Sequence, residues 1–406
     1  MNSRTLIRLA VVASLAAGLA FAALKSYDTS PAPDAAAAAR RAAIRKATAR
    51  VRGERARITH AGEAEEQKAK TIDDVTAGRF EAVEADAARL RAGVAAASAS
   101  AKALGPDGES PTTGPVVTAA GADGDYGPTL QALYKGAAQA LVDTETRRGV
   151  AASDSVLAAW RRALPDSVTR HVAEAEYRVQ QAWAARSGRV ASLVPASDMA
   201  MFETRIQQAG AALERGAAIR DAPVDPKLLS LTIVVGMASN APRADMDAVI
   251  DIAVEKCPAF TPVFEAMSAY LQTRWHGDPG DMEKYAESLR RRMPRPHGDI
   301  AYARVAAKMM RSEGDIFKNT RLRWPAVRDS LETLLETWPK ADETRRDLCR
   351  LAALAGDRET AARHFGVLGD RWNRVSYGAF SDEGTTLRWA KAYARSAGPA
   401  KPTPRR

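Results

Sequence analysis

The chain has 406 residues and a formal net charge of +10, with 6% aromatic residues. Alanine, leucine and arginine are good helix formers and runs of β-branched residues are scarce, which argues against a β-rich fold and predicts an all-α protein. The length allows more than one compact domain or one extended array. The positive charge permits anionic partners, but the sequence contains no recognised nucleic-acid-binding module, so we expect no nucleic-acid partner.

Residues 1–24 carry Arg4 and Arg8 ahead of an apolar run from Leu9 to Leu24. A short positive region before an apolar stretch predicts an export signal. The run is close to the length of about 20 residues that a membrane span needs, whereas residues 20–22 (AFA) resemble a cleavage site. A cleaved signal peptide and a retained membrane anchor are therefore both open.

Residues 25–70 begin with a Pro-containing linker and continue with an Ala/Arg-rich stretch that has almost no large apolar residues. Such a helix has no face to bury, so we predict a solvated basic stalk. A second interpretation is contact of this stalk with anionic lipid headgroups, which attract basic residues beside a membrane. The basic tract at 40–57 also leaves open a cytoplasm-facing adaptor, because positive residues tend to stay in the cytoplasm.

Residues 71–91 are predicted as the first core helices. Their candidate buried side chains are Ile72, Val75, Phe80, Val83 and Leu90. Residues 92–125 are rich in Ala, Gly, Ser, Thr and Pro without periodicity, which predicts a low-complexity flexible insertion.

From Tyr126 onward, apolar residues recur at helical spacing between short Pro, Gly or Asp signals. We predict a helical-repeat domain over 126–396, followed by a basic disordered tail at 397–406. The predicted helices are Thr129–Arg147, Ser153–Ala163, Ser167–Arg186, Asp198–Ile219, Pro226–Asn240, Ala244–Lys256, Pro262–Trp275, Asp281–Arg292, Asp299–Ser312, Pro325–Trp338, Ala341–Ala355, Arg358–Leu368 and Asp382–Ser396.

The clearest helical hairpin lies at 343–372. One apolar stripe ends at Ala355, the Gly356-Asp357 pair interrupts it, and a second stripe contains Ala361, Phe365 and Leu368. Consecutive helix pairs of roughly 34 to 45 residues are typical of an α-solenoid. In such an array each pair buries its apolar face only by stacking on its neighbours.

The hairpin at 343–372 resembles a tetratricopeptide repeat, since a small residue, an aromatic four places later and Leu368 match the second helix of that repeat. More widely, residues 72–372 resemble a bacterial domain-of-unknown-function family with tetratricopeptide-like helices. The resemblance implies a helical-repeat fold and no catalytic residues; the insertion at 92–125 and the N-terminal stalk depart from it. The blocks that carry it are DDVTAGRFEAVEADAARL (73–90), LPDS (164–167), AWAARSG (182–188), YLQTRWHGDPGDMEKYAESL (270–289), LRWPAVRDSLETL (322–334) and LAGDRETAARHFGVLGDRW (354–372).

The densest polar cluster comprises Arg274, Trp275, His276, Asp278 and Asp281. A histidine beside two carboxylates could serve as a metal or acid–base site. The spacing matches no defined metal motif, and a helix end followed by a turn and a new helix explains the same residues. We therefore expect no catalytic, cofactor-binding or metal site.

Tryptophans fall at helix ends or on apolar stripes, where they either fill the space between repeats or anchor a partner. The candidate partner-binding residues are Trp275, His276, Trp324 and Trp372. The two cysteines, Cys257 and Cys349, form no CxxC pair. They are either buried thiols or, in an exported chain, one disulfide.

These features together predict a non-enzymatic protein-interaction scaffold of the bacterial cell envelope. It would be anchored in the inner membrane and face the periplasm, or be free in the periplasm after signal cleavage. Its partner would be a protein or peptide of the envelope. The alternative is an envelope enzyme or metal-dependent cell-wall-handling protein that uses the cluster from Arg274 to Asp281.

Overall fold

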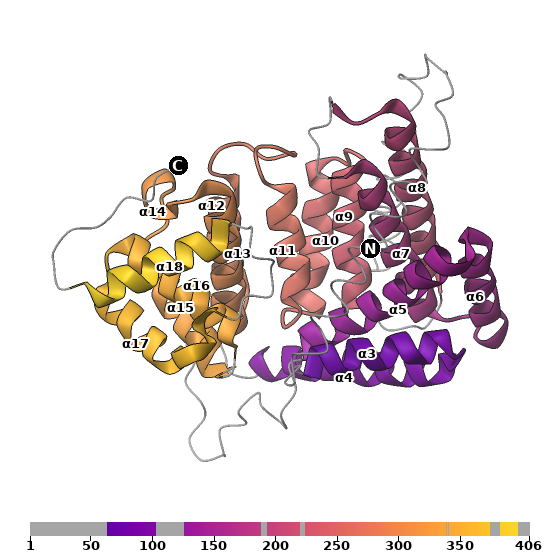
Figure 1. The fold of residues 1–406 in the computed structure, drawn as a ribbon, viewed down its shortest axis with the longest axis horizontal. Helices are drawn as coiled ribbons and strands as arrows, with labels where there is room; N and C mark the ends of the chain where they lie inside the picture. The colour runs from indigo at the N-terminus through magenta and orange to yellow at the C-terminus, as the bar shows by residue number, and fades with distance from the viewer. Residues whose placement is uncertain are drawn as a thin grey trace. The chain divides into compact units, whose positions relative to one another are not determined.

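The computed structural model describes residues 63–102, 126–187, 193–219, 224–337, 339, 341–373 and 382–396. These residues form sixteen α-helices and one 3-10 helix, and none of them forms a strand (Figure 1). The predicted all-α class is therefore confirmed for this part of the chain. The predicted signal or anchor at 1–24, the stalk up to residue 62 and the tail at 397–406 lie outside the described residues. None of the helices that the structure describes is long and apolar enough to cross a bilayer.

The chain divides into two compact units, each built from two separate stretches of sequence. The first unit comprises residues 1–94 and 124–253, and the second comprises residues 95–123 and 254–406. Two of the three boundaries fall inside helices, at residues 94/95 and 253/254, so the units are not two consecutive halves of the chain.

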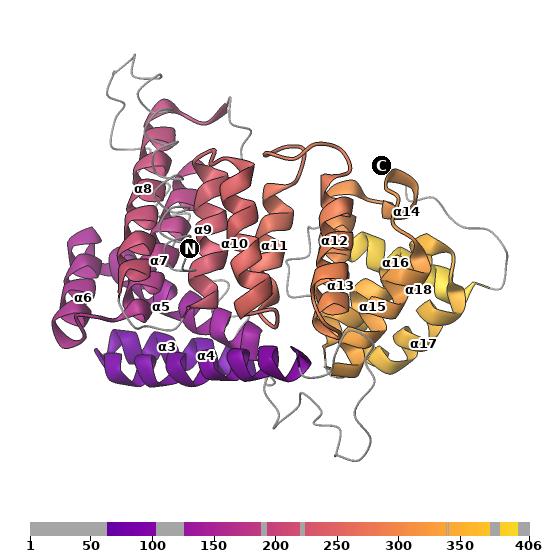
Figure 2. The ribbon, with the colours of Figure 1, turned by 180° about the vertical axis from the view of Figure 1, so that it is seen from behind.

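In the first unit, α5 contacts α3, α6 and α7, and α7 and α8 form a long antiparallel hairpin that both ribbon views show (Figures 1 and 2). Its core includes the rings of Phe80 and Trp160, which stack with their centroids 5.1 Å apart. The helices that contribute to this unit are α3 (Glu63–Thr76), α4 (Phe80–Lys102), α5 (Tyr126–Arg148), α6 (Val150–Ala163), α7 (Val168–Arg186), α8 (Ala196–Ala218), α9 (Pro226–Ala238) and α10 (Arg243–Lys256).

Helix α3 begins at Glu63, inside the segment predicted as a solvated stalk. Gln67 and Thr71 are buried, and a Cβ atom added to Gly136 of α5 would lie only 2.6 Å from the carbonyl oxygen of Lys68. Residues 63–70 are helical and most of their side chains are exposed, but α3 also packs on α5 through its backbone and polar side chains. Such packing leaves no stripe of large apolar residues in the sequence.

This close approach gives a direct test. Gly136→Ala is expected to destabilise the protein by about 1–2 kcal/mol, because the added methyl group forces α3 away from α5. The matched change Gly366→Ala in a helix of the second unit meets no atom within 4 Å, so it is expected to stabilise by up to about 1 kcal/mol through helix propensity alone. Urea unfolding followed by circular dichroism measures both; equal stabilisation by the two changes would contradict the close packing of α3.

Helix α4 continues to Lys102, well into the segment predicted as a flexible insertion. Val94 and Ser98 are buried on this extension, and the Ser98 hydroxyl accepts a hydrogen bond from the backbone N–H of Ala259 at 3.3 Å. The insertion prediction was wrong for 92–102 because alanine is the best helix former and a few small side chains suffice to bury one face. Residues 103–125 lie outside the described residues.

In the second unit, α13 contacts α11, α12, α15 and α16, and α16 contacts α17 and α18. Cys349, Phe365 and Leu368 belong to a core cluster with α18, and Cys257 and Cys349 are both buried thiols. The helices of this unit are α11 (Thr261–Tyr270), α12 (Asp281–Arg292), α13 (His297–Glu313), α14 (Ile316–Asn319), α15 (Trp324–Thr337), α16 (Asp342–Ala355), α17 (Arg358–Leu368) and α18 (Asp382–Arg395), with the 3-10 helix η2 (Gly369–Asn373).

Candidate functional site

The predicted cluster from Arg274 to Asp281 forms the turn between α11 and α12. Helix α11 ends at Tyr270 rather than at Trp275, because the backbone N–H of His276 turns back to the Tyr270 carbonyl at 3.1 Å. Gly277 is required there, since a Cβ atom would lie 2.0 Å from the Leu271 carbonyl oxygen.

The side chains of this turn are engaged within it. The His276 ring stacks on the Tyr270 ring with centroids 4.6 Å apart, and the Asp281 carboxylate accepts the backbone N–H of Asp278 at 3.1 Å. Among the residues that the structure describes, no group of three His, Cys, Asp or Glu side chains could hold a metal ion.

The other two candidate residues lie against α17. Trp324, at the start of α15, donates its indole N–H to the Asp357 carboxylate at 2.9 Å, and Asp357 caps α17 by accepting the backbone N–H of Thr360. The Trp372 ring packs edge-on against Phe365, and the Lys391 ammonium lies 3.8 Å from the Trp372 ring centroid. Both tryptophans therefore stabilise the α15–α18 packing, and their role in partner binding stays a prediction.

The best-connected polar group in the first unit is Asp225, whose carboxylate is fully buried. One oxygen accepts the backbone N–H groups of Lys227 and Leu228 and caps α9. The other accepts from the Tyr134 hydroxyl and from the Arg91 guanidinium at 2.9 Å. Four hydrogen bonds thus satisfy a charge whose burial without partners would cost several kcal/mol.

The same guanidinium links Asp225 to α7. Arg91 also donates to Thr169 at 3.0 Å, while the Glu84 carboxylate accepts from Thr169 at 2.5 Å and from Ser167, the residue that caps α7. Burial, and then the charge of Asp225, raise the pKa of Tyr134 well above its ordinary value, so this phenol stays protonated and donates. The network joins α4, α5, α7 and α9, and we read it as the structural centre of the first unit.

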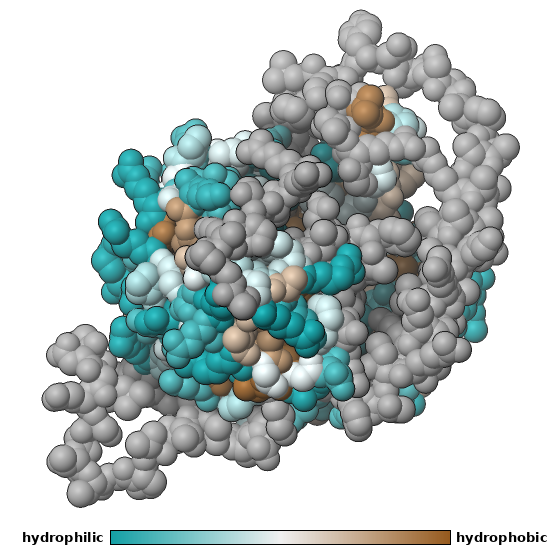
Figure 3. Space-filling view, turned by 60° about the vertical axis from the view of Figure 1, so that its left-hand side comes forward, coloured by the Kyte–Doolittle hydropathy of each residue, from teal (hydrophilic) through white to brown (hydrophobic). Residues whose placement is uncertain are grey.

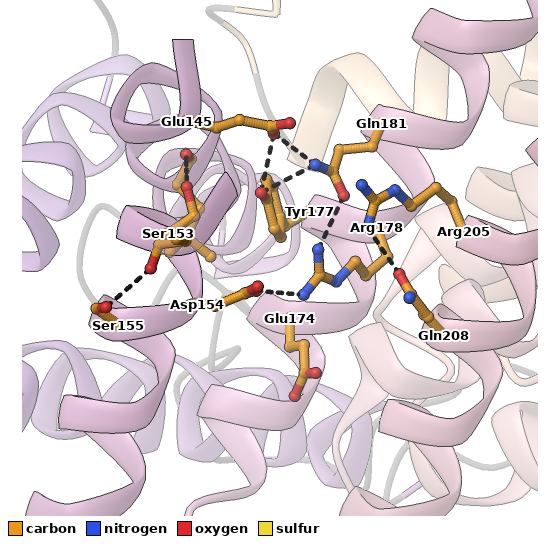
Figure 4. A network of polar contacts seen from close by, with 12 residues as sticks. Glu145, Ser153, Asp154, Ser155, Glu174, Tyr177, Arg178, Gln181, Arg205 and Gln208 are labelled. Atoms are coloured by element: carbon orange, nitrogen blue, oxygen red, sulfur yellow. Dashed lines mark hydrogen bonds and ion pairs between the residues drawn. The ribbon is translucent and has the colours of Figure 1, made fainter. Parts of the chain in front are cut away.

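A second network lies where α5, α6 and α7 meet (Figure 4). The Glu145 carboxylate accepts from the Tyr177 hydroxyl at 2.9 Å and from the Gln181 amide. The Arg178 guanidinium lies between Asp154, at 2.7 Å, and the Gln181 oxygen, at 3.1 Å. Figure 4 shows these side chains pointing toward one another, and their contacts connect α5, α6 and α7.

Large apolar side chains are exposed at few described positions. On the face drawn in Figure 3, the described surface is mostly hydrophilic and its hydrophobic residues form small separate groups. The two most exposed are Leu193, at 67% exposed, and Met201, at 53%. Both lie where α8 begins, at the tip of the α7–α8 hairpin.

The tip of the hairpin, which we define as the described residues within 183–202, also contains an aromatic pair. The Trp183 and Phe202 rings meet edge to face at 5.1 Å, and the Arg186 guanidinium lies over both rings. An exposed methionine side chain can adapt its shape to a partner. The packed Trp183–Phe202 pair in the same segment limits the conformational entropy that is lost on binding. The sequence analysis did not predict the exposure of Leu193 and Met201.

Comparisons with known proteins found no match, whether to a protein-family model, to a curated protein or to a solved structure. The resemblance to tetratricopeptide-like proteins therefore stays a prediction.

Proposed function

We propose that the chain is a non-enzymatic interaction protein of the bacterial cell envelope that binds a protein partner through the tip of the α7–α8 hairpin. The observation that carries this proposal is the exposure of Leu193, which lies just before α8, and of Met201 in the second turn of α8. Large apolar side chains that stay exposed beside packed aromatic rings are candidate contacts for a partner protein.

The helical-repeat architecture is part of the same proposal. In the first unit α7 packs against both α5 and α9, and in the second α13 packs against both α11 and α15. Contact of a helix with its second neighbour on either side is what stacked helix pairs produce. The envelope location rests on the apolar segment at 1–24, which lies outside the described residues, as does the stalk that could contact anionic lipid.

The test uses a photoreactive amino acid at position 201 of the full-length chain, followed by identification of the cross-linked protein and binding measurements with that protein in purified form. Met201→Asp is expected to weaken binding at least tenfold, because a charge in a desolvated contact costs more than about 1.4 kcal/mol. The matched control is Val367→Asp, because Val367 of α17 is 51% exposed but lies in the second unit. This variant is expected to leave binding unchanged. Equal loss in both variants, or adducts with lipid alone, would contradict the proposal.

A further inference from the structure

Two buried histidines accept hydrogen bonds from buried arginines. In the first unit the Arg170 guanidinium contacts Nε2 of His171 at 2.8 Å, and both side chains are buried. A guanidinium is always protonated and can only donate. Nε2 must therefore be the acceptor, and the His171 ring is neutral with its proton on Nδ1.

The second unit repeats this arrangement with different helices. The Arg345 guanidinium of α16 contacts Nδ1 of His364 in α17 at 3.0 Å, and both are again buried. The same argument makes the His364 ring neutral, with its proton on Nε2.

Each ring also has a glutamate near its other nitrogen, just beyond hydrogen-bond distance. Nδ1 of His171 lies 4.0 Å from the Glu174 carboxylate, and Nε2 of His364 lies 3.9 Å from the Glu332 carboxylate of α15. Both carboxylates are already engaged by arginines: Arg215 of α8 lies 3.3 Å from Glu174, and Arg363 contacts Glu332.

Burial and the surrounding arginines together oppose a second proton on both rings. Burial, reinforced by Arg170 and Arg215, lowers the pKa of His171 to about 3. Burial, reinforced by Arg345 and Arg363, lowers the pKa of His364 to about 4. Arg161 and Glu84 act on Arg170 with opposite signs and do not change this balance.

We propose that the two arginine–histidine pairs are acid-sensitive locks that open the helix packing of both units when the rings gain a proton. A protonated ring has no acceptor nitrogen, so the bond to Arg170 or Arg345 is lost and two cations face each other. In the first unit this change occurs where the His171 side chain packs closely on the backbone of Gly216 in α8. In the second unit it removes a bond between α16 and α17, and leaves Arg345 with the Pro339 carbonyl.

The direction of the pH effect follows from the two states. An unfolded histidine takes up a proton near pH 6.5, whereas the folded rings stay neutral down to about pH 4 and 3. The two pairs therefore contribute their full share to the free energy of unfolding above pH 6.5. This contribution is lost as the pH falls from 6.5 toward the pKa values of the folded rings. His297 is not part of this effect. Its Nε2 lies 3.1 Å from the Ala97 carbonyl oxygen and donates a hydrogen bond to it, and a protonated ring can still donate that bond.

The experiment compares the full-length protein with His171→Gln, His364→Gln and the double variant. Glutamine can accept the arginine hydrogen bond but does not titrate. Unfolding of the double variant at pH 5 is expected to take up about two protons fewer than unfolding of the original protein, with a correspondingly flatter fall of Tm between pH 7 and pH 4.5. The control, His276→Gln, replaces a half-buried ring in the α11–α12 turn and is expected to keep the original slope.

NMR of the original protein tests the proposal even where a variant fails to fold. At pH 5, at least two histidine Cε1 signals are expected at the position of a neutral ring. Titration of every histidine near pH 6.5 in the folded protein would overturn the proposal, and so would an unchanged Tm slope in a folded double variant.

Discussion

Asp225→Ala is expected to destabilise the protein by about 3–5 kcal/mol, the typical cost of removing one partner of a buried ion pair. The variant removes the Asp225 carboxylate from the Arg91 guanidinium, which is only 12% exposed. It also leaves the buried Tyr134 hydroxyl without the acceptor of its hydrogen bond. It also removes the cap of α9, which adds to the cost. Urea unfolding followed by circular dichroism measures the loss.

Two further variants separate the buried pair from a generic loss of charge. Asp247→Ala breaks the exposed pair with Arg243 within α10 and is expected to cost less than about 1 kcal/mol. The double variant Arg91→Met with Asp225→Asn is expected to lose less than the sum of the two single variants, because no unpaired charge then remains buried. A loss for Asp225→Ala no larger than that for Asp247→Ala would show that the network is not the centre of the unit.

Trp160→Ala is the second change with a large expected effect, again about 3–5 kcal/mol. The Trp160 side chain is fully buried at the end of α6 and stacks on Phe80 at the start of α4, so its removal leaves a cavity where these helices meet. Chemical denaturation measures the change in unfolding free energy.

Trp160→Phe is the control for this cavity. Within the described part of the chain, the buried indole N–H of Trp160 has no hydrogen-bond partner, so phenylalanine gives up no hydrogen bond and keeps a ring against Phe80. We expect a loss of about 1–2 kcal/mol. An alanine variant no less stable than the phenylalanine variant would rule out a tightly packed stack.

Helix positions could be predicted from the sequence because their signals are local. The bounds of α12 and α17 agree with the prediction, since Gly-Asp turns mark their starts and apolar spacing marks their faces. Proline at the first turn likewise placed α9, and Asp225 caps it from the preceding position. The short α14 and η2 were missed because one turn of helix carries too little periodicity.

The polar networks could not be predicted, because their members are far apart in the chain. Arg91 and Asp225 are separated by 134 positions, and neither residue stands out in its own segment. The pair of Arg170 and His171 is also hard to predict, because adjacent side chains of a helix usually point in different directions. In the structure both side chains are buried and the two contact each other.

The four candidate partner-binding residues show that residue type and position at a helix end do not predict which side chains are exposed. Trp324 and Trp372 were chosen as helix-end aromatics, and the structure gives both a packing role. Leu193 and Met201 each lie beside other apolar residues, so the local sequence resembles that of buried helix positions. Exposure depends on what covers a side chain, and that information is absent from local sequence.

The contacts of Arg91 also determine which fragments of the protein are expected to fold. A fragment that begins at residue 126, where the regular helical pattern starts, would contain Asp225 and Tyr134 but neither Arg91 nor the α3 backbone that covers Gly136. Such a fragment would expose an orphaned carboxylate and a bare helix face, so we expect it to aggregate on expression. Adding residues 63–102 on a separate chain should restore solubility, as complementation between split halves does in other discontinuous domains.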